Sequence, residues 1–310
     1  MLSKLKEMKK IRKKILEFEY KILSIDIGGS GMKIGIFKIN PILRIPILSS
    51  TLKKKNIALD NPEENIYNFI KEYIKDKKRN LKFACISLSD EIKIFKNWRS
   101  INKNKRNNYR GLLKKILTNK FNLQVYEIND IEAHSIGCRT MNGILNKRYI
   151  TFTLVLGTSP SIFISDKNGK IIKDSNKLMK KKKYLWEYNS INSSLGAKSY
   201  QEKKNIILNK NNEILDELII ENKYYFIKVW NTILKPIFIS GGNDKLNAWN
   251  FDEPPRFIFL TGGLAHSKLS GYISLMNSFL KKSSKLYKNT EIVLGPINSG
   301  LIGTSCLPFL

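Results

Sequence analysis

The stretch LSIDIGGSGMKIGIF, residues 23–37, decides how the rest of this chain is interpreted. An apolar run ends in Asp26, a glycine-rich turn covers residues 28–31, and an alternating run that carries Lys33 follows. Glycines let backbone N–H groups approach a phosphate closely. The turn continues as a strand and not as a helix, which excludes a P-loop and a dinucleotide fingerprint. Two interpretations stay open: a phosphate-binding hairpin, or a tight β-hairpin that needs glycine only for its shape.

Composition indicates a globular, strongly basic protein. The 310 residues are enough for two lobes of ordinary domain size, and 42% of them are hydrophobic. The 55 Lys and Arg residues against 26 Asp and Glu give a net charge of +29, which would attract polyanions. A second interpretation stays open, because Lys scattered beside many Ile and Asn is also what an AT-rich genome produces.

The cysteines favour a reduced, intracellular chain, and we expect it in the cytoplasm. Cys85, Cys138 and Cys306 are far apart and form no C-x-x-C pair. Only His134 and His266 accompany them, so no zinc-ligand spacing exists. No apolar run is long enough to predict a membrane span.

Residues 1–20 are charged throughout and lack the apolar centre of a secretory signal. Their apolar residues recur at steps of three and four, which predicts a basic amphipathic leader helix. A solvated helix is favoured over one that touches a membrane or a partner.

The first third of the chain has the element order of an actin-like lobe, with hairpin-joined strands, a third strand, a helix and a further strand. The predicted elements are strands at 21–26, 32–38 and 42–48, a loop at 53–55, a helix at 62–76 and a strand at 83–88.

Asn129-Asp130 joins a predicted strand at 124–128 to a predicted helix at 131–139. A carboxylate at the carboxyl end of a strand projects into the crevice where such sheets bind ligands. An Asp at this place can also cap the helix. On the residues alone, capping is the favoured role.

The second half of the chain contains a second glycine turn and two Gly-Gly pairs, Gly241-Gly242 and Gly262-Gly263. The turn, GTSPS at 157–161, joins two β-runs and is a candidate second phosphate loop. The predicted elements are strands at 148–156, 162–165, 257–260 and 291–294, and helices at 213–234, 267–281 and 298–310.

Four motifs and a tail then fall in one order. They are DIGGSGMK at 26–33, NDIEA at 129–133, LGT at 156–158, FLTGGLAHS at 259–267 and LGPINSGLIGTS at 294–305. This succession resembles the ROK family of sugar kinases, within the actin-like ATPase superfamily. The resemblance implies an α/β, two-lobed actin-like ATPase (ribonuclease H-like) fold with an interlobe cleft. The expected division is a leader at 1–20, an N-terminal lobe at 21–128, a C-terminal lobe at 129–299 and a terminal helix at 300–310.

The resemblance also implies roles for individual residues. It makes Asp130 the general base that takes a proton from a sugar hydroxyl, and Asn129 and Asn97 sugar-binding residues. It makes Asp26 a metal-binding residue as well as part of the first phosphate loop. The implied phosphate and nucleotide contacts are Asp26, Gly28, Gly29, Ser30 and Lys33 in the first loop, Gly157 and Thr158 in the second, and Gly262 and Gly263 at the adenosine side.

The chain departs from the family pattern in several places. GTSPS replaces GTGxG, so Ser159 stands for a glycine and Pro160 removes an N–H donor. The sugar-side loop lacks its Pro-Gly and keeps Asn97 and Trp98, and residues 170–180 lack the sugar-binding Glu-x-Gly-His. The His-Cys zinc motif is absent, as in the polyphosphate/ATP-glucokinase branch, which this basic chain resembles more than the other branches. Twenty residues before the first strand cannot hold the helix-turn-helix of the repressor branch.

The favoured hypothesis is a sugar kinase that phosphorylates a glucose-like hexose from ATP or polyphosphate with Mg²⁺ and without zinc. The alternative is a catalytically degenerate protein of the same fold that acts as a binding or regulatory module. A nucleic-acid binder rests on charge alone. The expected partners are a sugar and a phosphoryl donor. Polyanion contact through the basic surface and a homodimer remain open.

Overall fold

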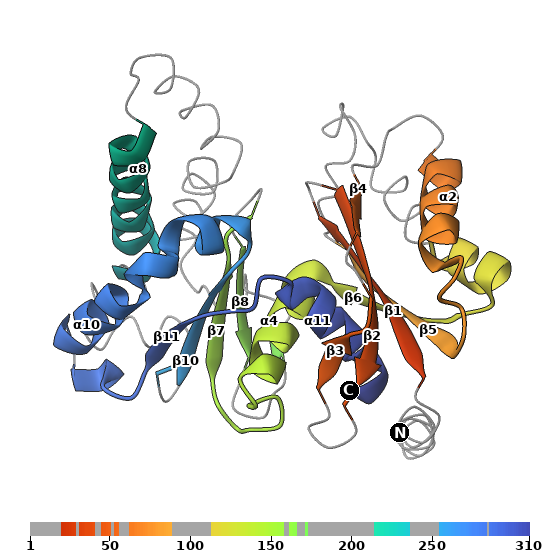
Figure 1. Ribbon diagram of the computed structural model, residues 1–310. Helices are drawn as coiled ribbons and strands as arrows, with labels where there is room; N and C mark the ends of the chain where they lie inside the picture. The colour runs from red at the N-terminus through yellow and green to blue at the C-terminus, as the bar shows by residue number, and fades with distance from the viewer. Residues whose placement is uncertain are drawn as a thin grey trace, which may run out of the picture. The chain divides into compact units, whose positions relative to one another are not determined.

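The two strands predicted on either side of the glycine turn pair antiparallel in the interior of a sheet in the computed structural model (Figure 1). The chain forms two compact units. Unit 1 consists of residues 1–141 and 298–310, and unit 2 of residues 142–297. The structure describes residues 20–28, 31–40, 45–50, 53–55, 62–88, 113–157, 161–165, 171–172, 214–235, 254–283 and 285–310.

The boundary between the units differs from the predicted one after residue 128. It lies after Met141, and residues 298–310 return to unit 1. The reason is the helix α4 (Asp130–Met141), which packs against α11 (Ser299–Ser305) and not within unit 2. Strand-helix junctions do not reveal which unit the helix will join.

Unit 1 is built on a six-stranded sheet with the order β3-β2-β1-β5-β6, in which β4 also pairs with β2. The β1–β2 pair is antiparallel, whereas β1, β5 and β6 run parallel. The carboxyl ends of β1, β5 and β6 therefore lie at one edge. The strands are β1 (Lys21–Gly28), β2 (Gly31–Ile39), β3 (Pro46–Leu48), β4 (Lys53–Lys55), β5 (Leu81–Leu88) and β6 (Gln124–Asn129).

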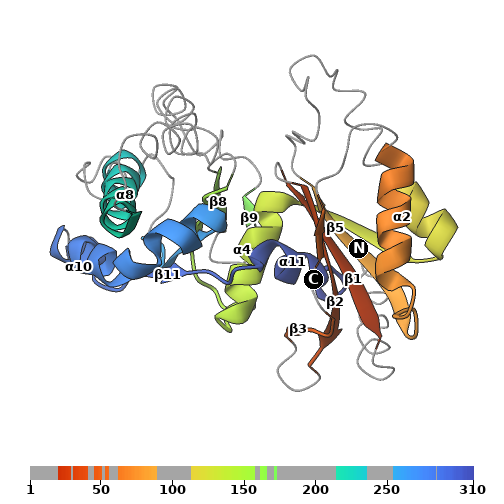
Figure 2. The same ribbon diagram turned by 45° about the horizontal axis from the view of Figure 1, so that its top comes forward.

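The alternation of β1 explains the two layers of helices around this sheet. Leu23 and Ile25 are fully buried in a core with α2 (Pro62–Ile74), which covers one face. Ser24 lies on the other face, where its hydroxyl donates a 2.7 Å hydrogen bond to the carbonyl of Leu301 in α11. Figure 2 shows α2 on one side of the sheet and α4 and α11 on the other.

Lys53–Lys55 form the edge strand β4, so the predicted loop at this place is wrong. The strand pairs antiparallel with Met32–Ile34, the first part of β2. Charge does not prevent this pairing, because an edge strand needs only backbone hydrogen bonds on one side and lysines are common there.

The predicted helix at 298–310 is shorter than expected. α11 ends at Ser305, and a separate 3₁₀ turn covers Leu307–Phe309. Pro308 lacks the N–H that an α-helix would need at this position, which explains the break. The helix predicted at 267–281 is likewise divided, into a π-helical turn at Ala265–Leu269, a 3₁₀ turn at Ser270–Tyr272 and α10 (Ile273–Ser283).

Unit 2 contains a five-stranded sheet with the order β11-β10-β7-β8-β9. β7 pairs antiparallel with β8, as the hairpin predicted at the second glycine turn requires. On its other side, β7 pairs parallel with β10. Its elements are β7 (Thr151–Val155), β8 (Ser161–Ser165), β9 (Ile171–Ile172), α8 (Ile214–Val229), a π-helical turn (Trp230–Leu234), β10 (Phe257–Thr261) and β11 (Glu291–Leu294).

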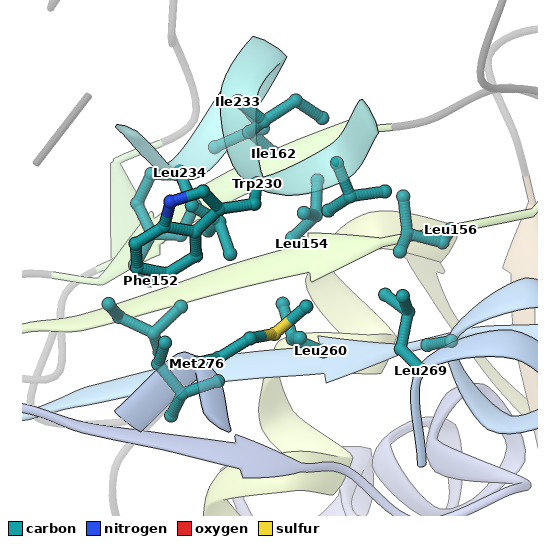
Figure 3. Close-up of a cluster of buried hydrophobic side chains, with 14 of the residues drawn as sticks. Phe152, Leu154, Leu156, Ile162, Trp230, Ile233, Leu234, Leu260, Leu269 and Met276 are labelled. Atoms are coloured by element: carbon teal, nitrogen blue, oxygen red, sulfur yellow. The ribbon is translucent and has the colours of Figure 1, made fainter. Parts of the chain in front are cut away.

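The core of unit 2 joins this sheet to its helices. Leu154 and Leu260, on neighbouring strands, are fully buried together with Met276 of α10. Trp230 and Leu234 reach the same cluster from the turn that ends α8 (Figure 3). In the described part of the helix predicted at 213–234, Phe226, Val229 and Trp230 are therefore core.

Several predictions fall on residues outside the described ranges. The leader helix belongs to this group, as do the Gly241-Gly242 pair and the candidate site residues Gly29, Ser30, Asn97 and Thr158. Among the helices that the structure describes, no helix is both long enough and apolar enough to cross a membrane.

Candidate active site

Asp26 is a buried carboxylate at the carboxyl end of β1, and only 7% of the residue is exposed. Its Oδ1 accepts a 2.7 Å hydrogen bond from the hydroxyl of Ser87. Ser87 is the register partner of Asp26 on the parallel strand β5. A carboxylate that is held by a neighbouring strand cannot rotate freely, so its second oxygen has a defined direction.

The second oxygen of Asp26 faces the first turn of α11. A Cβ on Gly300 would lie 2.9 Å from Asp26 Oδ2 and 3.2 Å from His134 Cε1. Gly300 therefore leaves room for a carboxylate from β1 and an imidazole from α4 to lie against the same backbone atom. We call Asp26, Lys33, Ser87, His134 and Gly300 the Asp26 cluster.

His134 joins α4 to α11 within this cluster. Its Nδ1 lies 2.6 Å from the hydroxyl oxygen of Ser299, a hydrogen-bonding distance. Burial lowers the pKa of His134 below its ordinary value; the positive charge of Lys33 acts in the same direction, and the carboxylate of Asp26 opposes both. Sequence reasoning considered His134 only as a zinc ligand. Its position four residues after Asp130, one turn along the same helix face, was the available signal.

Lys33 brings a cation to the same face of the sheet. It is the register partner of Asp26 across the β1–β2 hairpin, and it is half-buried. Among the described residues, no carboxylate lies within ion-pairing distance of Lys33.

Asn129 and Asp130 lie where β6 passes into α4. Asn129 occupies the cap position, and its Oδ1 accepts a 3.0 Å hydrogen bond from the N–H of Ile131. Asp130 Oδ1 accepts from the same N–H at 2.8 Å. The predicted capping role is therefore shared by both side chains. Asp130 remains half-buried at a helix N-terminus, which favours negative charge.

The two helices behind the cluster touch through their backbones. A Cβ on Gly303 would overlap the carbonyl of Ala133, and one on Gly137 would overlap the carbonyl of Ser299. Only glycine permits this approach. The close crossing of α4 and α11 brings His134 and Ser299 within hydrogen-bonding distance.

A separate group of predicted residues lies in unit 2. The N–H of Leu156 donates to the carbonyl of Thr261 at 2.7 Å, and its carbonyl accepts from Leu264 at 3.1 Å. Gly262, at a φ of +94°, packs on Leu156 so tightly that a Cβ would lie 2.5 Å from its carbonyl oxygen. These contacts bring the turn after β10 against the end of β7.

Gly157 and Gly263 have no such packing reason to be glycine. Among the described residues, a Cβ at either position would meet no heavy atom within 4 Å. The fold explains Gly262, whereas the open space at the other two positions leaves them free for contact with a ligand. In the first loop, Gly28 ends β1 and pairs in register with Gly31.

A divalent cation can be compared with the donors that the structure provides. The described residues hold no group of three or more His, Cys, Asp or Glu side chains that could bind a metal. Mg²⁺ is commonly bound through one or two carboxylates together with substrate phosphates. A single oriented carboxylate, Asp26, fits that mode of binding.

Comparison with solved structures finds the same fold in several kinases. A candidate N-acetylmannosamine kinase from Listeria monocytogenes, Lmo2764, has a TM-score of 0.61 at 14% identity, covering 93% of this chain and 98% of its own. An inorganic polyphosphate/ATP-glucomannokinase from Arthrobacter sp. strain KM has a TM-score of 0.52 at 13% identity, covering 93% and 98%.

A regulator shares the fold as well. A ROK-family transcriptional regulator, homologous to the Escherichia coli MLC protein, has a TM-score of 0.58 at 11% identity, covering 94% of this chain and 78% of its own. Protein-family models and curated protein sequences give no match. A ROK-family glucokinase from Streptomyces griseus has a TM-score of 0.52 at 13% identity, covering 93% of this chain and 98% of its own. The order of motifs predicted this result: the chain has the fold of ROK-family sugar kinases.

Proposed function

We propose that this chain is a sugar kinase that transfers a phosphoryl group from ATP or polyphosphate to a hydroxyl of a glucose-like hexose. One observation carries the proposal: Asp26 lies near the carboxyl end of β1 and Asp130 directly follows β6. These two strands flank β5, and their carboxyl ends lie at the same edge of the sheet. Ligands of such sheets bind at this edge. The shared fold with a polyphosphate/ATP-glucomannokinase supports the choice of reaction.

Asp130 acts as the general base in this proposal. Its carboxylate accepts the proton of the sugar hydroxyl as the hydroxyl oxygen attacks the terminal phosphorus. A new O–P bond forms, the bridging P–O bond breaks, and ADP or a shortened polyphosphate leaves with the electron pair. The α4 N-terminus stabilises the ionised form of Asp130 that must accept the proton.

The first loop and the Asp26 cluster hold the donor. Asp26 would bind Mg²⁺, which neutralises charge on the donor phosphates. Backbone N–H groups of the glycine turn and the ammonium of Lys33 would contact the same phosphates. The remaining assignments are Asn129 and Asn97 for the sugar, Gly157 and Thr158 for the second phosphate contact, and Gly262 and Gly263 for the adenosine side.

The decisive experiment measures phosphorylation of glucose, mannose, fructose and N-acetylated sugars with ATP and with polyphosphate. Asp130→Asn should fold normally and lose turnover by about 10²–10⁴-fold, the usual contribution of a general base. Glu127→Gln, an exposed carboxylate on the same strand β6, is the matched control and should keep full turnover. Full activity in Asp130→Asn would remove the general base from the mechanism.

A second candidate function is binding or regulation without catalysis. Pro160 in the second glycine turn cannot donate a backbone hydrogen bond to a phosphate. A transcriptional regulator also shares this fold. Folded protein that binds ATP or a sugar by calorimetry, yet gives no turnover with any pair of substrates, would favour this function.

A further inference from the structure

A row of cations crosses the sheet of unit 1 at the end where β1 and β5 begin. Ile47 on β3 pairs in register with Lys38 on β2. The β1–β2 register, continued by one residue, places Lys21 opposite Lys38. The backbone N–H of Lys21 in turn donates a 2.8 Å hydrogen bond to the carbonyl of Asn80, in the turn that enters β5. Figure 1 shows β3 beside the lower end of β2, at the end of the sheet away from β4.

The turn between α2 and β5 adds further cations to this end of the sheet. It is fixed by a 3.0 Å hydrogen bond from the N–H of Leu81 to the carbonyl of Lys78. Lys77 is already engaged, because its ammonium group donates a 2.9 Å hydrogen bond to the carbonyl of Tyr73. Lys78, Arg79 and Lys82 are exposed. We call the following six residues the basic edge: Lys21, Lys38, Ile47, Lys78, Arg79 and Lys82.

Ile47 gives the basic edge an apolar component. The residue is 47% exposed, and its register partner Lys38 is exposed on the same face of the sheet. A single exposed apolar side chain is common on protein surfaces and indicates nothing by itself. Beside several cations, it matches the surface of an anionic bilayer, where Lys and Arg contact headgroups and apolar side chains enter the boundary below them.

The sequence that leads into this edge has the same chemistry. Residues 1–19 contain seven Lys and Arg against three Glu, and their apolar residues recur at steps of three and four. The segment joins unit 1 at Tyr20, directly before Lys21. Such a basic amphipathic sequence is typical of segments that lie on membranes. Two neighbouring parts of the chain therefore combine cations with apolar side chains.

We infer that the basic edge binds the surface of a membrane that contains anionic phospholipids. The inference goes beyond the proposed function and does not rest on it. The Lys and Arg side chains contact the headgroup phosphates, and Ile47 enters the boundary between headgroups and acyl chains. Asp26 lies five residues after Lys21 on β1, about 16 Å away at ~3.3 Å per residue. A chain bound in this way keeps the edge with Asp26 and Asp130 away from the lipid.

A nucleic acid is the rival ligand, because its phosphates would also contact these cations. Two features of the basic edge favour lipid. None of its six residues is aromatic, whereas single-stranded nucleic acid is commonly bound by stacking of bases on aromatic side chains. Ile47 gains nothing from a phosphate backbone, but in a bilayer interface its side chain would be removed from water.

The experiment measures binding of the full chain to vesicles by sedimentation. The vesicles consist of phosphatidylcholine with roughly one third phosphatidylglycerol, or of phosphatidylcholine alone. The edge variant carries Lys78→Gln, Arg79→Gln and Lys82→Gln. The control variant carries Lys281→Gln, Lys282→Gln and Lys285→Gln, which removes three exposed cations at the same spacing from unit 2. Both variants therefore have the same net charge.

The edge variant should bind anionic vesicles about 100-fold more weakly than the wild type, the contribution of three cations at an anionic surface. The control variant should differ by less than about threefold, since salt screens charges that lie far from the bilayer. Ile47→Gln should weaken binding by about fivefold, the loss of one partly inserted side chain. Leu275→Gln, at an exposed apolar residue of α10, should have no effect. Circular dichroism and urea midpoints establish that all variants fold.

Several outcomes would overturn the inference. Equal binding of the edge and control variants would show a general charge effect, and equal binding of the wild type to both kinds of vesicle would show no role for anionic lipid. If Ile47→Gln binds like the wild type, the contact is purely ionic and the lipid assignment is lost. If the edge variant loses binding to a single-stranded RNA oligonucleotide but not to vesicles, the ligand is a nucleic acid. Because no turnover is measured, absence of kinase activity would refute the proposed function and leave this result standing.

Discussion

His134 Nδ1 lies 2.6 Å from Ser299 Oγ, although the two residues are 165 positions apart in the chain. The contact joins the helix that begins with Asp130 to the helix that lies against Asp26. The contact therefore links the helix that carries Asp130 to the helix whose Gly300 faces Asp26. This connection can be tested apart from catalysis.

A double-mutant cycle with His134→Ala and Ser299→Ala should reveal the coupling between these side chains. We expect a coupling energy of about 1 kcal/mol, the net value of one hydrogen bond between side chains. Urea unfolding of the two single variants and the double variant measures it. Additive effects of the two substitutions would contradict the contact.

Ser87→Ala should disturb donor binding through Asp26. The substitution removes the hydroxyl that donates to Asp26 Oδ1 and leaves a buried acceptor, at a cost in stability of about 1–3 kcal/mol. Without that contact, the carboxylate is no longer held in one direction, and we expect weaker Mg²⁺-dependent binding of ATP. Ser24→Ala is the control, since it removes a buried hydroxyl from the same face that donates to α11 and not to Asp26. Equal ATP affinity in both variants would contradict the positioning role of Ser87.

Gly137→Ala and Gly303→Ala should each destabilise unit 1 severely. The added methyl group overlaps backbone atoms of the opposite helix, which can move only if α4 and α11 separate. We expect a loss above about 3 kcal/mol, beyond the usual range of single substitutions. Thermal unfolding measures it, with Gly271→Ala as the control because open space surrounds that position. Similar melting temperatures in all three variants would contradict the close crossing.

The three cysteines should react slowly with thiol reagents in the folded protein, since Cys85, Cys138 and Cys306 are all buried. Burial raises the pKa of Cys85 well above its ordinary value, and Cys306 raises it further. Burial likewise raises the pKa of Cys306 to about 11. Little thiolate then exists near neutral pH, and the thiolate is the reactive form. Titration with a disulfide reagent should therefore count three thiols only after unfolding, and rapid native labelling would contradict this burial.

His266 should make the protein less stable as the pH falls below 6.5. Burial lowers the pKa of His266 from 6.5, and the carbonyls of Pro296 and Gly295 oppose this effect only in part. Its Nε2 is buried and has no hydrogen-bond partner in the described part of the chain, so a proton there would be unfavourable. Between the lowered pKa and 6.5, the unfolded chain then binds more protons than the folded chain. The free energy of unfolding therefore decreases as the pH falls through that window.

His266→Gln removes this proton uptake. Its free energy of unfolding should depend less steeply on pH below 6.5 than that of the wild type. Urea unfolding at several pH values measures both slopes. Since His134 is present in both proteins, the difference belongs to His266, and equal slopes would contradict its lowered pKa.

The local features of the fold could be predicted from the sequence. The glycine turn after Asp26 indicates the β1–β2 hairpin. Asn129 and Asp130 after an apolar run indicate the junction between β6 and α4. Each pattern involves residues close in sequence, so propensity and spacing are enough to indicate it. The motif order then predicted the fold.

The contacts around Asp26 could not be predicted in the same way. Ser87, His134 and Gly300 reach that carboxylate from three elements, and only the packing of α11 on the sheet brings them together. Lys53–Lys55 were expected in a loop, yet pairing with β2 makes them a strand. Such pairing depends on a distant partner, which a local pattern does not contain.

The place of α11 in the chain has a consequence for synthesis. Residues 298–310 follow the whole of unit 2 in the chain, so unit 1 cannot be completed until unit 2 has been synthesised. Unit 1 has all its strands by then but lacks the helix that covers Ser24 and Asp26. A stop codon just before α11 would release a protein with an intact unit 2 and an uncovered sheet face, the kind of surface that chaperones retain.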